Sequence, residues 1–316
     1  MSTRKKWRKL RAPFAAAALR VVVWVVVRLR YSHLAKLAAG LGWIAHLSPA
    51  VRRLIRANLR VAFPDWEDRE IRTGSRIVIQ NSLLTSLEFI WFSAHPGEAK
   101  KMISHADDKS RDKLQQTLND HIPTLFITPH LGNWELAARF ACEEGIRVSI
   151  VARKQKIPGL EDLISTGRQG EGLTIYPQEG AARGMMTALK KGEAVGVLMD
   201  QNVKPRRGGV FVDFFGLPVP ATRAPAALAR KMKADAICFA CVRQGDAFQF
   251  HMKTLPKPAY EYGDDLELTQ ALLKLNEEMI AEFPLQYTWL YERWRYIPEG
   301  ADQALIDKYP YYKKRS

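Results

Sequence analysis

Short β-rich runs alternate with helix-like segments through the second half of the chain, and this alternation restricts the fold more than any other feature. The β-rich runs are Thr124–Thr128, Val148–Ala152, Leu173–Tyr176, Ala194–Met199, Ala236–Val242 and Phe248–Lys253. The helix-like segments are Trp134–Glu144, Leu160–Gln169, Ala181–Lys190 and Thr222–Met232, with an earlier one at Asp68–Phe92. This order predicts an α/β domain with a central, largely parallel sheet flanked by helices.

The positive charge of the chain is concentrated at its beginning. The 316 residues include 48 Lys and Arg against 33 Asp and Glu, but 14 of those cations precede Asp65, the first acidic residue. The remainder is nearly neutral. A nucleic-acid-binding domain would spread its cations over a folded face, so this distribution argues against that class. It favours a basic segment that meets an anionic surface, followed by a globular body.

Two apolar stretches in the basic segment point to a membrane. Six cations occur among the first eleven residues, and the stretches Ala12–Val27 and Leu34–Leu47 follow. Neither stretch has the roughly 20 uninterrupted apolar residues that span a bilayer comfortably. A marginal single span and a pair of interfacial helices both remain open, and a buried helical hairpin is a third alternative. We expect residues 1–48 to form a membrane-anchoring helical segment and 49–316 to form the body, facing the cytoplasm.

The three cysteines do not suggest a disulfide framework or a metal site. Cys238 and Cys241 form a C-x-x-C motif inside an apolar β-rich run, with no second Cys or His pair near them in sequence. Core packing is therefore the better interpretation, and the low cysteine count fits a reducing compartment.

A histidine and a glutamate flank the first strand-to-helix turn. The segment Pro129-His130-Leu131-Gly132-Asn133-Trp134-Glu135 ends a β-rich run, and Gly132 permits a tight turn before a helix capped by Asn133. The spacing allows Glu135 to fold back onto the imidazole, fix its tautomer and raise its basicity. No G-x-S-x-G nucleophile is present, so His130 would activate a hydroxyl of the substrate. The alternative is a turn histidine beside a glutamate that favours the helix N-terminus.

Further short motifs follow in a fixed order along most of the chain. They are Arg56–Pro64, Pro129–Glu135, Arg153, Arg168 with Gly170, Leu189–Glu193, Met199–Gln201, Phe214–Gly216 with Pro218, Pro284–Trp289, and Arg293 with Trp294. This ordered set resembles the bacterial lipid A biosynthesis lauroyl/myristoyl acyltransferases, within the wider His-x4-Asp/Glu glycerolipid acyltransferases. One departure is Tyr287, where Trp is expected. The same set occurs in relatives that acylate other glycolipids, such as phosphatidylinositol mannosides.

The resemblance implies transfer of a fatty acyl group from acyl carrier protein to a hydroxyl of a membrane glycolipid, with lipid A precursor as the expected acceptor. It makes the body a single glycerolipid-acyltransferase-like domain on the cytoplasmic face of the bacterial inner membrane. The implied partners are acyl carrier protein, the glycolipid acceptor and anionic lipids, not nucleic acid. The chemistry requires no metal and no cofactor.

The resemblance also implies roles for individual residues. His130 is the general base, and Glu135 orients it. Arg168 is the first candidate for the donor that stabilises the oxyanion, and Arg153 the second; surface solvation or phosphate contact is the alternative for both. The residues expected to bind the acceptor or order the site are Asn133, Arg153, Asp200 and Gln201; a simple strand-terminal turn is the alternative for Asp200 and Gln201.

Docking an acidic carrier protein onto a nearly neutral body requires a local basic patch. The candidates are Lys204 with Arg206 and Arg207, and the group Arg223, Arg230, Lys231 and Lys233. The apolar residues Phe211, Phe214, Phe215 and Leu217 suggest a lipid-facing loop, an acyl groove or ordinary core. Two other functions stay open: a non-enzymatic basic tethering protein at the membrane, and a hydrolase that uses the same histidine on water.

Overall fold

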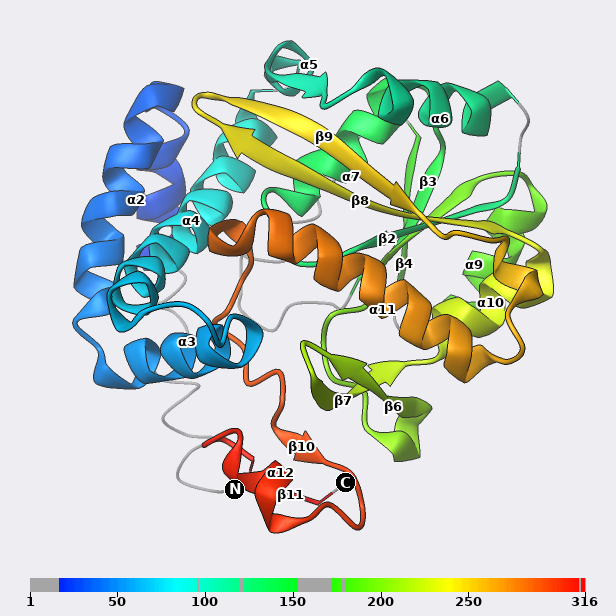
Figure 1. The fold of residues 1–316 in the computed structure, drawn as a ribbon. Helices are drawn as coiled ribbons and strands as arrows, with labels where there is room; N and C mark the ends of the chain where they lie inside the picture. Colours follow the sequence, from blue (N-terminus) through cyan, green and yellow to red (C-terminus); the bar gives the residue numbers. More distant parts are fainter. Residues whose placement is uncertain are drawn as a thin grey trace, which may run out of the picture.

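A twisted, largely parallel sheet forms the centre of the molecule (Figure 1). The computed structural model describes residues 17–95, 97–119, 122–152, 172–177, 180–312 and 314–315. The strands of the described sheet follow the order β1-β9-β8-β2-β5-β3-β4. The strands β2, β3, β4, β5 and β8 run parallel, while β9 is antiparallel to β8 and parallel to β1. The predicted α/β class and sheet are confirmed.

The predicted elements agree closely with those observed. The strands of the sheet are β1 Ile103–His105, β2 Thr124–Thr128, β3 Val148–Ala152, β4 Leu173–Pro177, β5 Ala194–Leu198, β8 Asp235–Gln244 and β9 Ala247–Thr254. The helices are α2 Tyr31–His46, α3 Pro49–Ala62, α4 Asp68–Ala94, α5 Glu98–Met102, α6 Asp108–Asn119, α7 Trp134–Glu143, α9 Ala181–Lys190, α10 Ala224–Met232, α11 Asp265–Glu282 and α12 Gln303–Asp307. The helix predicted at Leu160–Gln169 lies outside the described residues.

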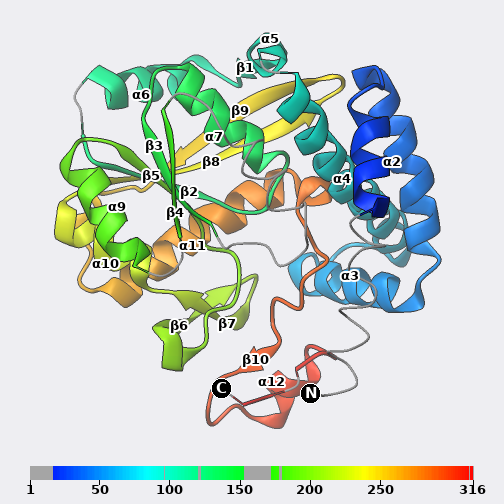
Figure 2. The ribbon, with the colours of Figure 1, turned by 180° about the vertical axis from the view of Figure 1, so that it is seen from behind.

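Each face of the sheet is covered by helices. Because β2 is central, all five of its residues are buried, with Leu125 and Ile127 facing one apolar cluster and Phe126 the other. The first cluster includes residues of α9, α10 and α11, and the second includes residues of α7. Helix α4 contributes to both clusters, with its first half in one and its second half in the other. Figures 1 and 2 show α11 on the opposite side of the sheet from α7.

The C-terminal part of the chain completes the fold around the sheet edge. A hairpin of β6 Gly209–Phe214 and β7 Leu217–Thr222 follows the short 3-10 helix η1 Pro205–Arg207. Its residues Phe214 and Leu217 are buried in the core, so core packing is the correct alternative for these two. After η2 Ala259–Glu261 and α11, the 3-10 helix η3 Pro284–Gln286 returns to the sheet, and the short pair β10 Tyr296–Ile297 and β11 Lys314–Arg315 follows. Cys238 and Cys241 are buried in β8, which confirms their role in core packing.

The N-terminal helices pack against the outer flank of the body. A ten-residue helix, Ala17–Val26, precedes α2, and α2 lies along α4 with Leu34, Ala38 and Gly42 buried. The indole of Trp91 in α4 donates a hydrogen bond to the Leu29 carbonyl at 2.9 Å. Among the described residues, α4 is the helix long and apolar enough to cross a membrane, but 44% of its apolar window is buried inside the protein. Helix α2 therefore packs onto the body, although it lies in the segment predicted as the membrane anchor. The predicted boundary between an anchor of residues 1–48 and a body of residues 49–316 stays a prediction.

Candidate functional site

His130 and Asp200 meet at the carboxyl edge of the sheet because their strands are neighbours. Strands β2 and β5 pair in parallel, with Thr128 opposite Leu198. His130 follows the end of β2 by two residues, and Asp200 follows the end of β5 by two residues. In parallel α/β sheets, functional groups gather at this edge because all the strands end there.

Asp200 holds both the side chain and the backbone of His130. The Nδ1 atom of His130 lies 2.7 Å from Oδ1 of Asp200, and the His130 backbone N–H donates to Oδ2 at 3.0 Å. The carboxylate is buried, with 2% of the side chain exposed. Because an ionised carboxylate only accepts hydrogen bonds, Nδ1 must carry a proton, which leaves the lone pair of the neutral ring on Nε2.

The charges around this pair determine its protonation. Burial alone would lower the pKa of His130, but the charge and hydrogen bond of Asp200, together with the charge of Glu135, raise it above its ordinary value. Burial alone would raise the pKa of Asp200, but the charge and hydrogen bonds of His130 and the charge of Arg293 keep it below its ordinary value. The site therefore pairs a histidine of raised pKa with an aspartate that stays ionised to lower pH than usual.

The Nε2 atom of His130, on the other side of the ring from Asp200, contacts Gln201. Nε2 lies 3.3 Å from Nε2 of Gln201, whose amide can donate to the lone pair. Gln201 is exposed, so another hydrogen-bonding group can replace its amide at the imidazole. The indole of Trp134 packs edge-on against the His130 ring, with centroids 5.0 Å apart.

The structure differs from the predicted pairing of His130 with Glu135 in the carboxylate that binds the imidazole. The carboxylate on Nδ1 belongs to Asp200, 70 residues away in sequence, whereas Glu135 lies in the first turn of α7 and acts on His130 through its charge. A spacing of five residues placed Glu135 near the ring but could not reveal a closer carboxylate from the next strand. An orienting role for Glu135 stays a prediction. Arg153 and Arg168 lie outside the described residues, so their roles also stay predictions.

The turn between His130 and α7 requires glycine and an asparagine cap. Gly132 has a φ of +59°, and a Cβ added there would lie 2.1 Å from the Cys241 carbonyl oxygen of β8. Asn133 caps α7 as predicted, with Oδ1 accepting from the Leu136 N–H at 3.1 Å. The backbone is tied down on both sides: the Asn133 N–H donates to the Cys241 carbonyl at 2.7 Å, and the Thr288 N–H donates to the His130 carbonyl at 3.0 Å.

A buried ion pair supports this turn from behind. Arg243 of β8 donates to both carboxylate oxygens of Glu88 in α4, from Nε at 2.6 Å and from Nη2 at 2.8 Å. Glu88 also accepts from the Asn133 amide at 2.9 Å and from the Tyr31 hydroxyl at 3.0 Å. Its side chain is fully buried. The Thr85 hydroxyl, which accepts from Arg243, donates to the Gly132 carbonyl at 2.9 Å. Helix α4 and strand β8 thereby fix the turn that follows His130 through hydrogen bonds.

Replacing Glu88 with glutamine is expected to destabilise the protein by about 3–5 kcal/mol, because it leaves the buried Arg243 cation without its countercharge. Urea unfolding of the variant measures the loss. The matched control is Glu98→Gln, which removes an exposed carboxylate paired with Lys101 and should change stability by less than about 1 kcal/mol. Equal stability of the two variants would contradict the structural role of the pair.

Sequence reasoning missed the groups that surround Asp200. The Tyr287 hydroxyl hydrogen-bonds Asp200, and Arg293, which is 1% exposed, donates through Nη1 to Oδ1 of Asn202 at 2.5 Å. Both residues belong to motifs of the resemblance, but no local spacing marks them as site residues. The one available signal is the clustering of Tyr, Trp and Arg in a segment without strong periodicity, at 287–294.

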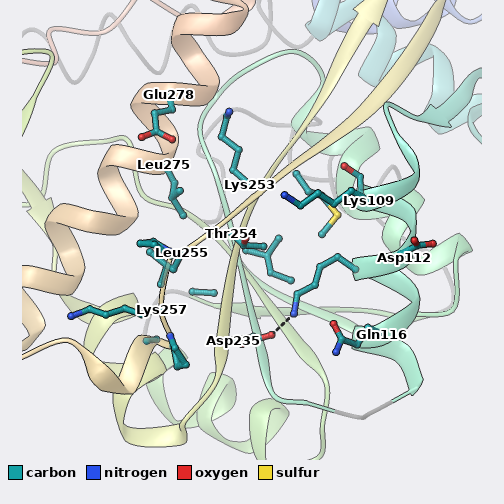
Figure 3. Close-up of a pocket in the computed structure, with 18 of the residues that line it drawn as sticks. Lys109, Asp112, Gln116, Asp235, Lys253, Thr254, Leu255, Lys257, Leu275 and Glu278 are labelled. Atoms are coloured by element: carbon teal, nitrogen blue, oxygen red, sulfur yellow. Dashed lines mark hydrogen bonds and ion pairs between the residues drawn. The ribbon is translucent and has the colours of Figure 1, made fainter.

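A large cavity lies away from this site. It has a volume of about 1050 Å³ and lies between α6, α11 and the strands β8 and β9. Figure 3 shows Asp235 among the residues that line this cavity. Its carboxylate pairs with Lys113 at 2.7 Å. Asp235 begins β8, opposite Thr124 at the start of β2, so the cavity is at the other end of the strands from His130. Within the described ranges, no three His, Cys, Asp or Glu side chains lie close enough together to hold a metal ion.

The fold and the His130 turn thus define an α/β protein with an activated histidine at the carboxyl edge of a parallel sheet. The profile of the family "Bacterial lipid A biosynthesis acyltransferase" matches residues 3–296, and the chain belongs to this family.

Relatives with known functions agree with this family. The chain is 29% identical over 292 residues to the lipid A biosynthesis lauroyltransferase of Escherichia coli (strain K12). The aligned region covers 88% of this chain and 90% of the relative. It is 25% identical over 293 residues to the lipid A biosynthesis palmitoleoyltransferase of the same organism, covering 90% and 92%. A phosphatidylinositol mannoside acyltransferase of Mycobacterium tuberculosis is 26% identical over 187 residues, covering 58% of each chain.

Proposed function

We propose that this protein transfers a fatty acyl group from acyl carrier protein to a hydroxyl of a membrane glycolipid, and that the acceptor is a lipid A precursor. The observation that carries the proposal is the geometry of His130. Its Nδ1 is held by the buried Asp200, and its Nε2 faces an exposed amide that a hydroxyl can replace. Family membership supplies the reaction class. The lipid A relatives support this acceptor, since they match about nine-tenths of the chain, whereas the phosphatidylinositol mannoside relative matches 58%.

In the proposed reaction, Nε2 of His130 takes the proton of the acceptor hydroxyl while its oxygen attacks the thioester carbonyl. The C–O bond forms, the carbonyl oxygen becomes an oxyanion, and collapse of the tetrahedral intermediate breaks the C–S bond. The proton on Nε2 then passes to the thiolate of the carrier protein. Asp200 stabilises the imidazolium throughout, as carboxylates do in other His-dependent acyl transfers.

Two further roles belong to this proposal. Arg168, with Arg153 as the second candidate, supplies positive charge to the oxyanion. The carrier protein docks on the basic residues of η1, where Arg206 and Arg207 are exposed and Lys204 lies over the Tyr296 ring at 4.8 Å. This patch begins four residues after Asp200, whereas Arg230 of the other predicted patch is paired with Asp265 at 2.8 Å.

A reconstituted assay tests the proposal. Purified full-length protein is incubated with acyl carrier protein that carries a fatty acid, and with either a lipid A precursor or a phosphatidylinositol mannoside. The masses of the lipid products are measured by mass spectrometry. We expect one added acyl ester on the lipid A precursor. Acylation of the phosphatidylinositol mannoside alone would show that the acceptor is this lipid and not the lipid A precursor. Release of free fatty acid without acceptor would indicate a hydrolase, and the absence of turnover with either lipid would favour a tethering protein.

We place the protein on the cytoplasmic face of the bacterial inner membrane. The acceptor is a lipid, and the described N-terminal helices expose large apolar side chains: Val21, Trp24, Trp43, Ile44 and Leu47. Acyl carrier protein is a cytoplasmic donor, so the site must open to that side.

A further inference from the structure

Four arginines and a histidine gather where α2, α3 and α4 meet. We call this group the arginine corner; its members are His46, Arg52, Arg56, Arg72 and Arg76. Arg52 is fixed by its Nη1, which donates to the His46 carbonyl at 2.6 Å at the end of α2. Ser75 of α4 joins the helices, with its Oγ 3.3 Å from Nε2 of His46 and 3.5 Å from Nε of Arg56.

The positive charges of the arginine corner lie close enough to repel one another. Burial and the charges of Arg52, Arg56 and Arg76 lower the pKa of His46, and burial with the charges of Arg52 and Arg72 lowers the pKa of Arg56. Asp68 offsets part of this charge, but it is fully exposed, and it pairs with Arg60 at 2.8 Å more closely than with Arg72 at 3.8 Å. Like charges held together at a cost to stability are typical of a site that binds an opposite charge.

An apolar stripe lies beside the arginine corner on α2. Its members are Trp43, Ile44 and Leu47, with 59%, 59% and 55% of their surfaces exposed. They occupy the last turn of α2 and the residue after it, adjacent to His46. Surfaces that enter the headgroup region of a bilayer typically combine exposed tryptophan and aliphatic side chains with neighbouring arginines.

Both features lie on the outer flank of the molecule. Figures 1 and 2 show α2 at the outermost edge, with the helix Ala17–Val26 beside it and α3 crossing below. That helix also carries the exposed side chains of Val21 and Trp24. Helices α2 and α3 meet at a bend of 100°, so they do not form one continuous span.

We infer that the arginine corner and the apolar stripe form one docking surface for an anionic phospholipid bilayer. The stripe enters the headgroup layer, and the arginines bind lipid phosphates around it. Arginine suits this role because its planar guanidinium pairs with phosphate oxygens bidentately. The anchor helices then lie along the bilayer surface, which is the interfacial alternative left open by the sequence. An acidic protein partner is the competing occupant, but it would not require the apolar stripe.

The docking surface also determines how the catalytic turn faces the membrane. Helix α4 carries Ser75, which contacts the arginine corner, and 13 residues later Glu88, which hydrogen-bonds Asn133 of the turn after His130. At 1.5 Å per residue, these points are roughly 20 Å apart along the helix axis. One rigid helix therefore sets the height of His130 relative to the lipid phosphates. This inference extends the proposed membrane location and does not depend on acyl transfer.

Vesicle binding of the full-length protein tests the inference. The variant Arg56→Gln/Arg72→Gln/Arg76→Gln is compared with wild type in co-sedimentation with vesicles of 30% phosphatidylglycerol in phosphatidylcholine. At about 1 kcal/mol for each cation near an anionic surface, partially offset by Asp68, we expect a roughly 10- to 100-fold weaker partition coefficient. The matched control is Arg183→Gln/Lys190→Gln/Lys191→Gln, which removes three exposed cations from the α9 end and should bind as wild type does.

Other outcomes overturn the inference. Equal weakening by both triple variants would show a general charge effect, and normal vesicle binding with lost binding of acyl carrier protein would assign the corner to the protein partner. Displacement from vesicles by inorganic phosphate at constant ionic strength would indicate a site for free phosphate. Thermal unfolding controls for folding: the corner variant should be at least as stable as wild type, because it relieves repulsion.

A second measurement isolates the apolar stripe. Vesicles with brominated acyl chains quench tryptophans that enter the bilayer, and the difference between wild type and Trp43→Phe reports Trp43 alone. We expect this difference signal to be quenched with phosphatidylglycerol vesicles. An unquenched Trp43 signal on bound protein would show that the stripe does not enter the bilayer, and the proposed surface would be wrong.

Discussion

Replacement of His130 by alanine is expected to lower the rate of acyl transfer by about 10²–10⁴-fold, the usual contribution of a general base. Nε2 of the imidazole contacts the exposed Gln201 amide, and Asp200 holds the other ring nitrogen at 2.7 Å. The measurement is transfer from loaded acyl carrier protein to the lipid acceptor, with folding checked by thermal unfolding.

The control for this experiment is another histidine. His95→Ala removes a ring at the end of α4 that stacks on Trp91 and hydrogen-bonds its carbonyl, so transfer should continue at a rate close to that of wild type. Undiminished transfer by a folded His130→Ala protein would remove His130 from the mechanism. It would leave the family assignment intact, because that assignment rests on the whole chain.

Replacement of Asp200 by asparagine is expected to reduce transfer by about 10²–10⁴-fold, because an amide can stabilise the wrong tautomer of the imidazole and cannot balance its charge. The pH dependence adds a second readout. The base works in its neutral form, and Asp200 raises the pKa of His130, so the acid limb of the rate profile should lie above the ordinary histidine range of about 6.5. In Asp200→Asn this limb should move to lower pH.

Glu135→Gln provides the comparison that separates the two carboxylates. Glu135 raises the pKa of His130 through charge, so the variant should move the acid limb in the same direction but less than Asp200→Asn does. A larger shift or a larger loss of rate in Glu135→Gln would restore Glu135 as the orienting residue. An unchanged acid limb in Asp200→Asn would contradict the electrostatic role of Asp200.

The same pair contributes to stability over a defined range of pH. His130 has a raised pKa in the folded state, so its contribution is fully present at low pH and is lost as pH rises through that pKa. Asp200 has a lowered pKa, so its contribution is present above its unfolded value and is lost as pH falls through the folded value. The ion pair is therefore strongest between these two pKa values.

The sequence predicted the sheet well because its information is local. Buried parallel strands are short, apolar and bounded by turn residues, so β2 and β3 were predicted with the bounds that the structure shows. The β6–β7 hairpin was not predicted, because Pro218 and Pro220 interrupt the usual strand pattern. Its pairing around Phe215 and Gly216 depends on a turn with positive φ at both residues.

The site was only partly predictable because its contacts join distant segments. His130 was identified by its turn, and Asp200 and Gln201 by the end of a strand. Their meeting depends on the order of strands, which periodicity does not determine. The ion pair of Glu88 with Arg243 joins residues 155 apart, and each looks like an ordinary charged residue in its own element. Such pairs become visible only when the fold places both side chains in the same core.

The hydrogen bond from the Thr288 backbone to the His130 carbonyl has a consequence for synthesis of the protein. The ribosome delivers His130 when more than half of the chain is still missing, and it delivers Arg243 and Thr288 much later. The turn around His130 cannot reach its final geometry until those residues have left the exit tunnel. The assembly of this turn therefore waits for segments that the ribosome adds late, whatever the earlier helices have already formed.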